Sequence, residues 1–248
     1  KSFLLNIIEG YTKWFHEQAD KILVPTQEYV DILKQRGFTP EKLGVFRRGI
    51  DSNNFSPKEK DGRNYLTEKL SLKGDVNLVY AGRISTDKNI DFTVRAFQEI
   101  LKEKPNVNLI FVGDGPYLPE LKQKYSHIEQ IYYTGHIPND MLPLVYSGSD
   151  LLVFASETDT FGMVVLEAQA CGVPALVSNI GGPKGVIKDG STGYVLDTKN
   201  QELWTNKLLE MISWVETKDE RYIKMKNNAR ENVVSNFDAN RVLENYFQ

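Results

Sequence analysis

The chain has 248 residues, of which 41% are hydrophobic and 25% are charged, and this ordinary composition excludes a largely disordered protein. Its 30 basic and 33 acidic side chains give a formal net charge of −3, so the chain as a whole has no electrostatic attraction to nucleic acid or anionic lipid. One cysteine, Cys171, excludes an internal disulfide and a cysteine-based zinc site, and no apolar run reaches the ~18 residues of a membrane span.

The first 50 residues predict a small α/β segment. Apolar side chains between Leu4 and Phe15 recur at three- and four-residue spacing, which is typical of an amphipathic helix with a broad apolar stripe. Short strands are expected at 21–25 and 43–47, with a helix between them. The chain begins without an initiator Met or a signal-peptide layout, so we expect it to start inside a longer, cytoplasmic protein. The stripe is then core packing or surface uncovered by truncation, with a contact face for a partner as the alternative.

A polar, turn-rich linker is expected at 50–61, and beyond it the chain alternates regularly. Helical stretches are expected near 89–104, 116–126, 138–147 and 162–171, followed by a helical tail from residue 200 to about Asn236. Apolar strands are expected to start at Val76, Val107, Ile128, Asp150, Pro174 and Gly193. This rhythm predicts an α/β fold with a Rossmann-like parallel sheet flanked by helices. We therefore expect two parts, residues 1–50 and residues 51–248.

Small residues follow four of these strands, and in an open parallel sheet ligands lie just beyond such ends. Gly82 follows the first strand, and the next residues supply two cations, Arg83 and Lys88, a pairing suited to a pyrophosphate. A solvated loop with two surface charges is the alternative. The position at a strand end favours the binding site.

The ends of the next two strands carry weaker signals. Gly113 opens a Gly-Asp-Gly-Pro turn that begins like a dinucleotide fingerprint, but Leu118 replaces its third glycine, which disfavours a nicotinamide site. Gly135, His136 and Ile137 form a turn whose backbone groups are able to face a planar base. A lone histidine is usually structural, and no acidic or cysteine cluster here indicates a metal.

The segment from 154 to 174 is the most informative one. Its helix opens after a polar loop, so its first N–H groups are free to bind phosphate. These are expected at Phe161, Gly162, Met163 and Val164. Asp159 in the loop and Glu167 in the helix have seven residues between them, and two such carboxylates suit a ligand that also carries hydroxyl groups. The alternative is that Asp159 caps the helix and Glu167 is half-exposed filler.

Taken in order, these segments resemble the donor-binding half of a retaining glycosyltransferase of family 4, which has the GT-B fold. The resemblance covers roughly residues 43–196 and rests on Arg48-Gly49-Ile50-Asp51 with Phe55-Ser56-Pro57, then GRISTDKN, FVGDGP, GHIP, TDTFGMVVLEAQACGVP, GGP and DGSTGYVL. Residues 1–48 are similar to the end of the family's N-terminal domain, so the acceptor-side half upstream is expected to be missing.

The resemblance implies a role for each matched position. Arg83 and Lys88 would hold the donor diphosphate, the amides of the helix start would hold phosphate and sugar, Glu167 would contact the ribose and Asp159 the transferred sugar. Two positions depart from the family pattern: Asp159 stands where Glu is more common, and Gly185 stands where many members carry an acidic residue.

The implied activity is transfer of a sugar from a nucleoside-diphosphate donor (UDP or GDP) with retained configuration, with no cofactor and no essential metal. The acceptor is expected to be a glycan or lipid-linked, and the fragment is expected to bind nucleotide without turnover. Two alternatives remain: a nucleotide-sugar epimerase of GT-B fold, and a non-catalytic nucleotide-binding or interaction domain. A late basic cluster, Lys224, Lys226 and Arg230, is expected to be a solvated face, with peripheral membrane association as the alternative.

Overall fold

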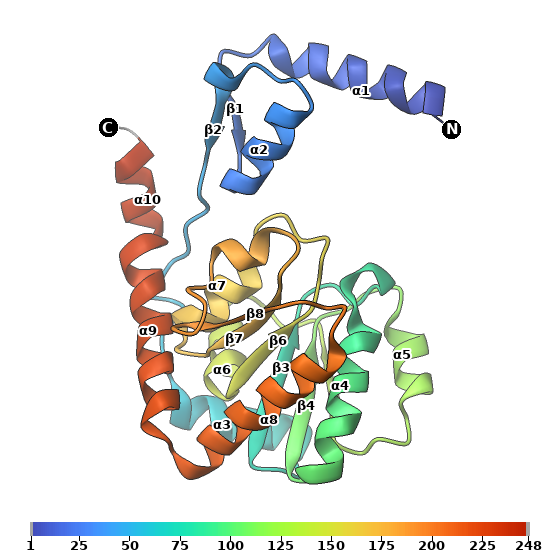
Figure 1. The fold of residues 1–248 in the computed structure, drawn as a ribbon. Helices are drawn as coiled ribbons and strands as arrows, with labels where there is room; N and C mark the ends of the chain where they lie inside the picture. The colour runs from blue at the N-terminus through green and yellow to red at the C-terminus, as the bar shows by residue number, and fades with distance from the viewer. Residues whose placement is uncertain (1, 247–248) are drawn as a thin grey trace.

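The computed structural model describes the backbone of residues 2–246 and the side chains of residues 4–244. Figure 1 shows a small N-terminal unit above a larger α/β body. The helices are α1 (Ser2–Glu17), α2 (Gln27–Gln35), α3 (Glu59–Leu70), α4 (Ile90–Glu103), α5 (Leu118–Lys124), α6 (Leu142–Ser147), α7 (Met163–Ala170), α8 (Gln201–Thr217), α9 (Glu220–Asn236) and α10 (Ala239–Tyr246), with short 3-10 turns at Pro40–Lys42, Thr86–Lys88 and Gly182–Gly185. The strands are β1 (Ile22–Val24), β2 (Leu43–Val45), β3 (Val76–Ala81), β4 (Val107–Val112), β5 (Ile131–Gly135), β6 (Leu151–Phe154), β7 (Ala175–Ser178) and β8 (Gly193–Leu196).

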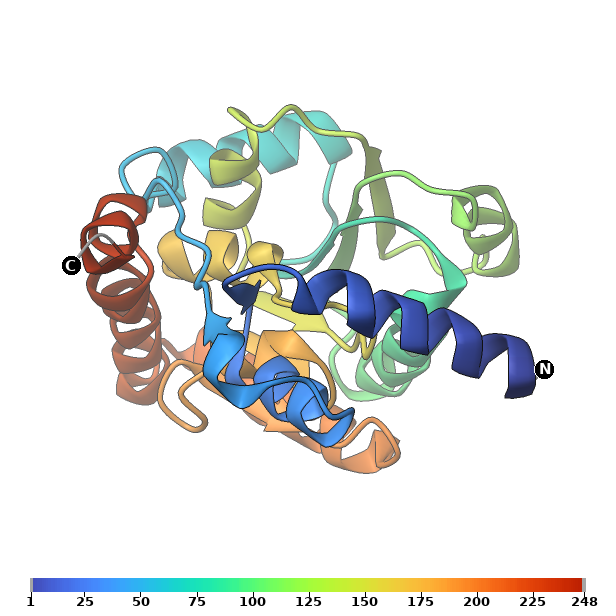
Figure 2. The same ribbon diagram turned by 90° about the horizontal axis from the view of Figure 1, so that it is seen from above.

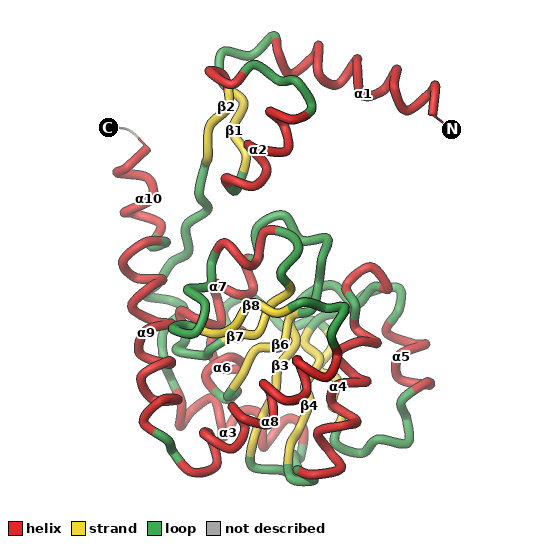
Figure 3. The backbone as a smooth tube through the Cα atoms, viewed as in Figure 1, coloured by secondary structure: helices red, strands yellow, loops and turns green. Residues whose placement is uncertain are grey.

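The larger body is built on a six-stranded sheet in the order β5-β4-β3-β6-β7-β8, and every neighbouring pair is parallel. Helices cover both faces: α4 packs against α8 on one side, while α3, α6 and α7 pack together on the other, with α9 against α7 (Figures 2 and 3). All residues of β3, β4, β6 and β7 are buried, as expected for strands enclosed on both faces. This confirms the predicted α/β fold.

The core reaches the carboxyl edge of the sheet as a row of aromatic rings. Tyr80 lies beside its register partner Phe111, with ring centroids 5.5 Å apart, and beside Phe154 at 5.7 Å. The Tyr80 hydroxyl donates to the carbonyl oxygen of Arg83 at 2.9 Å. The apolar core therefore fixes the backbone of the loop that follows β3.

The N-terminal unit consists of the parallel pair β1 and β2 with α2, and α1 extends away from it (Figure 1). The predicted amphipathic helix is present, but its apolar side chains do not pack into the core of the part of the chain that the structure describes. The apolar side chains along it are 52–65% exposed, namely Leu4, Leu5, Ile7, Ile8, Tyr11, Trp14 and Phe15. Among the described helices, none combines the length and apolar content that crossing a membrane requires.

The connection between the two parts is fastened to the C-terminal helices. The backbone of Ile50 pairs with the segment between α9 and α10, accepting from Ala239 and donating to Phe237 at 2.9 and 2.8 Å. Arg230 of α9 donates to the carbonyls of Ser52, Phe55 and Ala170 at 2.6–2.8 Å. The expectation of a solvated basic face is therefore wrong for Arg230.

Two helices were not expected from the sequence. The predicted linker ends early because α3 begins at Glu59, and α10 follows α9 after a break at Phe237. In α3 only Gly62 and Leu66 are fully buried, so its apolar periodicity is too weak to predict it.

Candidate functional site

The candidate site lies at the carboxyl edge of the sheet, where the strand order reverses. β3 is followed in the chain by β4 and β5 on one side, whereas β6, β7 and β8 lie on its other side. The loops after β3 and β6 therefore lie on the two sides of this switch point, which is where doubly wound sheets bind ligands, and we call the region between them the crevice. The predicted loop 82–89 and the predicted loop 155–162 are these two loops.

Glycines let the loops after β3, β4 and β5 approach one another closely. A Cβ on Gly113 would lie 2.0 Å from the carbonyl oxygen of Gly82, and Gly113 has a φ of +129°. Gly82 donates to Val112 and Gly113 donates to Gly135, both at 2.9 Å. Gly82, Gly113 and Gly135 are therefore brought to one edge.

The turn after β5 contributes one exposed and one buried side chain. Ile137 is 4% exposed and belongs to the core. His136 is exposed, and its ring makes no hydrogen bond with the described residues. The structure thus leaves His136 facing solvent at the rim of the edge.

Lys88 and Asp159 meet across the crevice. The Lys88 ammonium lies 2.9 Å from Asp159 Oδ2 and donates to the Thr158 hydroxyl at 3.0 Å. Ser156 donates a hydrogen bond to the same carboxylate oxygen. The Lys88 and Asp159 side chains are 15% and 28% exposed, so the ion pair is partly shielded from water.

Arg83 differs from Lys88 in having no partner. Its side chain is exposed and forms no ion pair or hydrogen bond with the described residues, although its backbone is held by Tyr80. A guanidinium on a fixed backbone with five unused donors is suited to an anion at the crevice.

The start of α7 lies on the other wall of the crevice. Gly162 is the N-cap of α7 at a φ of +91°, and no side chain caps the helix. A Cβ on Gly162 would meet Pro183 at 2.9 Å, so the turn at 181–183 packs directly against this terminus. Phe161 anchors the loop in the core, whereas the amides of Met163 and Val164 have no carbonyl one turn earlier in the helix. These two amides are thus the donors that the terminus is able to offer an anion.

Glu167 lies further along α7 and is half-buried. The hydroxyl of Tyr146, itself fully buried, donates to Glu167 Oε2 at 2.7 Å. Burial raises the pKa of the Glu167 carboxyl, and the Tyr146 hydrogen bond partly opposes that shift. Its second oxygen accepts no hydrogen bond from the described residues and is available to a ligand.

Some residues of this site carried no sequence signal. Tyr146, which fixes Glu167, lies in α6 and is brought there only by the helix packing. Glu157 accepts from Asn89 at 3.2 Å and also from Thr198, so it ties three loops together. The only sequence signal for Glu157 is its position between Ser156 and the predicted Asp159.

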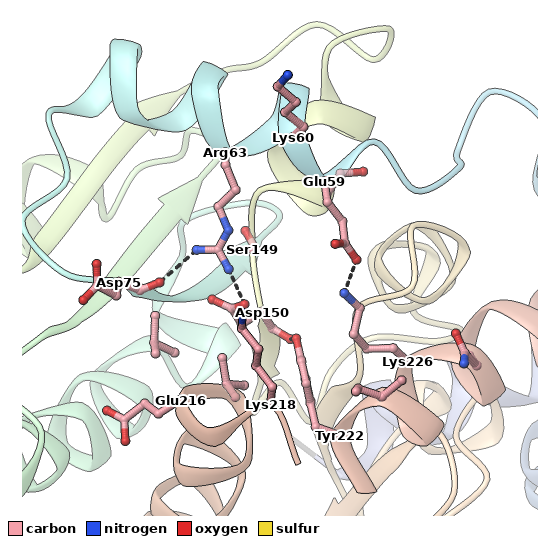
Figure 4. Close-up of a pocket in the computed structure, with 15 residues that line it drawn as sticks. Glu59, Lys60, Arg63, Asp75, Ser149, Asp150, Glu216, Lys218, Tyr222 and Lys226 are labelled. Carbon is pink, nitrogen blue, oxygen red and sulfur yellow. Dashed lines mark hydrogen bonds and ion pairs between the residues drawn. The ribbon is translucent and has the colours of Figure 1, made fainter. Parts of the chain in front are cut away.

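A cavity of about 860 Å³ lies at the opposite, amino-terminal edge of the sheet (Figure 4). Arg63 pairs with Asp150 and donates to the carbonyl of Asp75 at 2.9 Å, and Lys226 pairs with Glu59. Burial raises the pKa of the Asp150 carboxyl against the opposing effect of Arg63. Arg63 and Lys226 therefore already have partners in this cavity. Lys226 of the predicted basic cluster thus forms a surface ion pair with Glu59, whose side chain is 61% exposed.

Among residues 4–244, no three His, Cys, Asp or Glu side chains are grouped so that they could hold a metal ion. The candidate site is thus a crevice with an unpaired guanidinium, a paired ammonium, a free helix terminus and two carboxylates.

Comparison with known proteins finds related sequences and structures. A family model described as glycosyl transferases group 1 matches residues 63–232. The chain is 25% identical to the sulfoquinovosyl transferase SQD2 of Arabidopsis thaliana over 222 residues, which cover 88% of this chain and 42% of that protein. It is 31% identical to the alpha-monoglucosyldiacylglycerol synthase of Streptococcus pneumoniae over 177 residues, which cover 69% of this chain and 40% of that protein. The chain thus spans less than half the length of these relatives.

Solved structures share the fold. The Anabaena protein Alr3699/HepE, solved in complex with UDP, matches with a TM-score of 0.81 at 20% identity, covering 92% of this chain and 63% of that one. The sucrose-phosphate synthase of Thermosynechococcus elongatus matches with the same TM-score of 0.81 at 24% identity, covering 97% and 60%. These likenesses confirm the GT-B type of α/β fold.

Proposed function

The chain belongs to the glycosyl transferases group 1, and from this we propose that residues 51–248 are the donor-binding half of a retaining, family 4 type hexosyltransferase. Residues 1–50 would then be the end of the acceptor-side domain. The observation that carries the proposal is the contact between Lys88 and Asp159. It joins the cation that we propose to bind phosphate and the carboxylate that we propose to bind the sugar, at the point where the strand order reverses.

In this proposal the diphosphate of the donor lies between Arg83, Lys88 and the start of α7. Lys88 uses its contacts with Asp159 and Thr158 to hold its ammonium in place, and Arg83 keeps all its donors for the ligand. The amides of Met163 and Val164 add donors along the positive end of the helix dipole. These groups would neutralise the charge that develops when the diphosphate leaves, and so stabilise the transition state.

The nucleoside and the sugar would occupy either side of that diphosphate. Glu167 accepts from the ribose hydroxyls through its free oxygen while Tyr146 holds the other one. Asp159 accepts from the sugar hydroxyls through Oδ1, since Oδ2 is used by Lys88 and Ser156. The base would rest on the glycine-rich edge formed by Gly82, Gly113 and the turn at 135–137.

The donor is proposed to be a UDP- or GDP-sugar, and transfer is proposed to need no metal and no further cofactor. The named relatives include a sulfoquinovosyl transferase and a glucosyldiacylglycerol synthase, which supports a lipid-linked or glycan acceptor and a contact with the membrane surface. Because the chain spans less than half of them, we expect it to bind the donor without turning it over. All of these relatives are named as transferases or synthases, so an epimerase or a non-catalytic domain is not favoured.

The proposal is tested by calorimetric titration of the chain with UDP, GDP and ADP. We expect at least one of them to bind, and absence of binding by all three at millimolar concentration would contradict the proposal. Glu167→Gln keeps an acceptor for Tyr146 but removes the charge, so it should weaken the nucleoside diphosphate by roughly 1.5–3 kcal/mol, about 10- to 150-fold in Kd.

Inorganic pyrophosphate and a control variant make this test specific. Pyrophosphate lacks a ribose, so Glu167→Gln should leave its affinity unchanged. The control is Glu202→Gln, a substitution of an exposed glutamate in the first turn of α8. Equal weakening of the nucleotide and pyrophosphate by Glu167→Gln would reject the assignment of the ribose to this residue.

A further inference from the structure

A cavity of about 530 Å³ lies between the N-terminal unit and the larger body, and it reaches Phe161 beside the start of α7. The N-terminal unit and its connection contribute Thr26, Glu28 and Arg47, and the body contributes the turn 182–188 and the end of α9. Figures 1 and 2 show β1, β2 and α2 lying over the carboxyl edge of the sheet, above this turn. The size is in the range of cavities that hold small organic ligands.

The charge lining this cavity is mostly positive. Three cations and one carboxylate contribute to its wall: Arg47, Lys184, Lys188 and Glu28. Lys184 is committed, because its ammonium lies 3.0 Å from both Glu28 Oε1 and the carbonyl of Asn179. Arg47 and Lys188 are exposed, and within residues 4–244 their side chains have neither an ion pair nor a hydrogen bond. The cavity therefore holds two cations whose charge is not locally balanced.

The wall of the cavity is also the back of the loop that carries Asp159. Gly182 lines the cavity and donates to the carbonyl of Asp159 at 2.8 Å, and Phe161 lines it from the start of α7. Gly185 adds no side chain: a Cβ there would meet only Thr26 Cγ2, at 4.0 Å. The 3-10 turn therefore presents no carboxylate to the two unpaired cations.

We propose that this cavity binds a phosphate group carried by the acceptor; this rests on the proposed function, which places the transferred sugar beside Asp159. Two cations without partners suit a dianion better than a neutral sugar. Because Gly182 lines the cavity and donates to the carbonyl of Asp159, the cavity borders the loop that would hold the sugar. The rest of the cavity has room for the group that the phosphate is attached to.

The experiment titrates glycerol 3-phosphate into the full chain saturated with the nucleoside diphosphate that binds best, so that the donor crevice is filled. We expect the double variant Arg47→Gln/Lys188→Gln to bind it about tenfold more weakly or worse, since each lost charge acts at short range near the protein surface. Glu28→Gln should change it in the opposite direction, because it removes the one carboxylate and releases Lys184. Lys60→Gln, an exposed lysine of α3 at the other edge of the sheet, is the matched control and should have no effect.

Several outcomes would overturn the proposal. In the first, the wild-type protein binds the nucleotide but does not bind glycerol 3-phosphate at about 50 mM. In the second, the wild type and the glutamine variant bind glycerol 3-phosphate with equal affinity. If the charge-preserving pair Arg47→Lys/Lys188→Arg binds as weakly as the glutamine variant, the loss is structural and the proposal also falls. Failure of every nucleotide to bind would instead count against the proposed function, and the cavity would then be probed with inorganic phosphate alone.

Vesicles distinguish the two sources of the phosphate. A lipid headgroup is identified if the wild-type protein sediments with vesicles that contain phosphatidic acid but not with vesicles of pure phosphatidylcholine, and if the glutamine variant does not sediment with either. Binding of glycerol 3-phosphate without vesicle binding identifies a soluble phosphate ester.

Discussion

Arg83 and Lys88 are predicted to bind the same anion but to differ in their contribution to the stability of the fold. Single substitutions separate the effect on binding from the effect on stability. Arg83→Gln changes an exposed side chain that makes no ion pair or hydrogen bond with the described residues. Lys88→Gln removes an ammonium held at 2.9 Å by Asp159 and at 3.0 Å by Thr158. Both variants should lose affinity for a nucleoside diphosphate, but only the second should lose stability.

The sizes of these effects follow from the geometry. A hydrogen bond to a charged group contributes about 1.5–3 kcal/mol when shielded, and partial exposure of this pair reduces the expected cost of Lys88→Gln to about 1–2 kcal/mol of unfolding free energy. Arg83→Gln should stay within about 0.5 kcal/mol of wild type. For the ligand, a cation about 4 Å from a phosphate contributes between about 1 and 4 kcal/mol as the effective dielectric falls from bulk water to a protein surface. We therefore expect either variant to weaken nucleotide binding by about 10- to 100-fold.

Urea unfolding measures the stability and calorimetric titration measures the affinity of the same preparations. Raising the salt concentration should weaken the contribution of exposed Arg83 more than that of shielded Lys88. If Arg83→Gln binds the nucleotide as tightly as wild type, the diphosphate does not lie where we place it. If Lys88→Gln is fully stable, the ion pair does not organise the crevice.

Two further predictions concern the loops and the opposite edge of the sheet. In urea unfolding, Gly113→Ala should lower the free energy of unfolding by at least about 1 kcal/mol more than Gly135→Ala does. Both glycines have a positive φ, but a Cβ on Gly113 would lie 2.0 Å from the carbonyl oxygen of Gly82, whereas a Cβ on Gly135 would meet nothing within 4 Å. Equal losses would show that the close approach of the two loops is not rigid. Arg63→Met should lower the unfolding free energy by about 2 kcal/mol at pH 7, since it leaves the buried Asp150 carboxylate unpaired. The folded-state pKa of Asp150 is raised, so protonation of its carboxyl relieves that penalty as the pH falls. The difference in unfolding free energy between Arg63→Met and wild type should therefore shrink as the pH falls through the raised pKa. A difference that does not vary with pH would contradict this explanation.

The sheet could be predicted from sequence because its strands are buried on both faces. Segments such as Val76–Ala81 and Val107–Val112 are almost continuously apolar and end at a glycine, so their position and direction follow from local pattern. The crevice follows in turn, because parallel strands bring their carboxyl ends to one edge. This is why Arg83, Lys88 and Asp159 could be assigned to one edge from sequence alone.

The contacts that fix those residues could not be predicted in the same way. Tyr146 reaches Glu167 only because α6 packs beside α7, and the tethering of the linker by Arg230 joins residues about 175 positions apart. A side chain like Arg230 has the same local pattern as a solvated one, and its role depends on which carbonyls the fold presents to it. Long-range polar contacts of this kind leave no periodicity in the sequence.

The ion pair between Lys88 and Asp159 also bears on the departure of Asp159 from the family pattern. Although Asp is one methylene shorter than Glu, it reaches the Lys88 ammonium at 2.9 Å and accepts from Ser156 on the same oxygen. The shorter side chain therefore keeps its contact with the cation, and what it gives up is reach toward a bound sugar. If the sugar is to contact its free oxygen, the sugar has to approach the loop more closely than it would with Glu. Asp in place of Glu at position 159 should thus change the position and choice of the sugar, while the contacts of Lys88 with the diphosphate are kept.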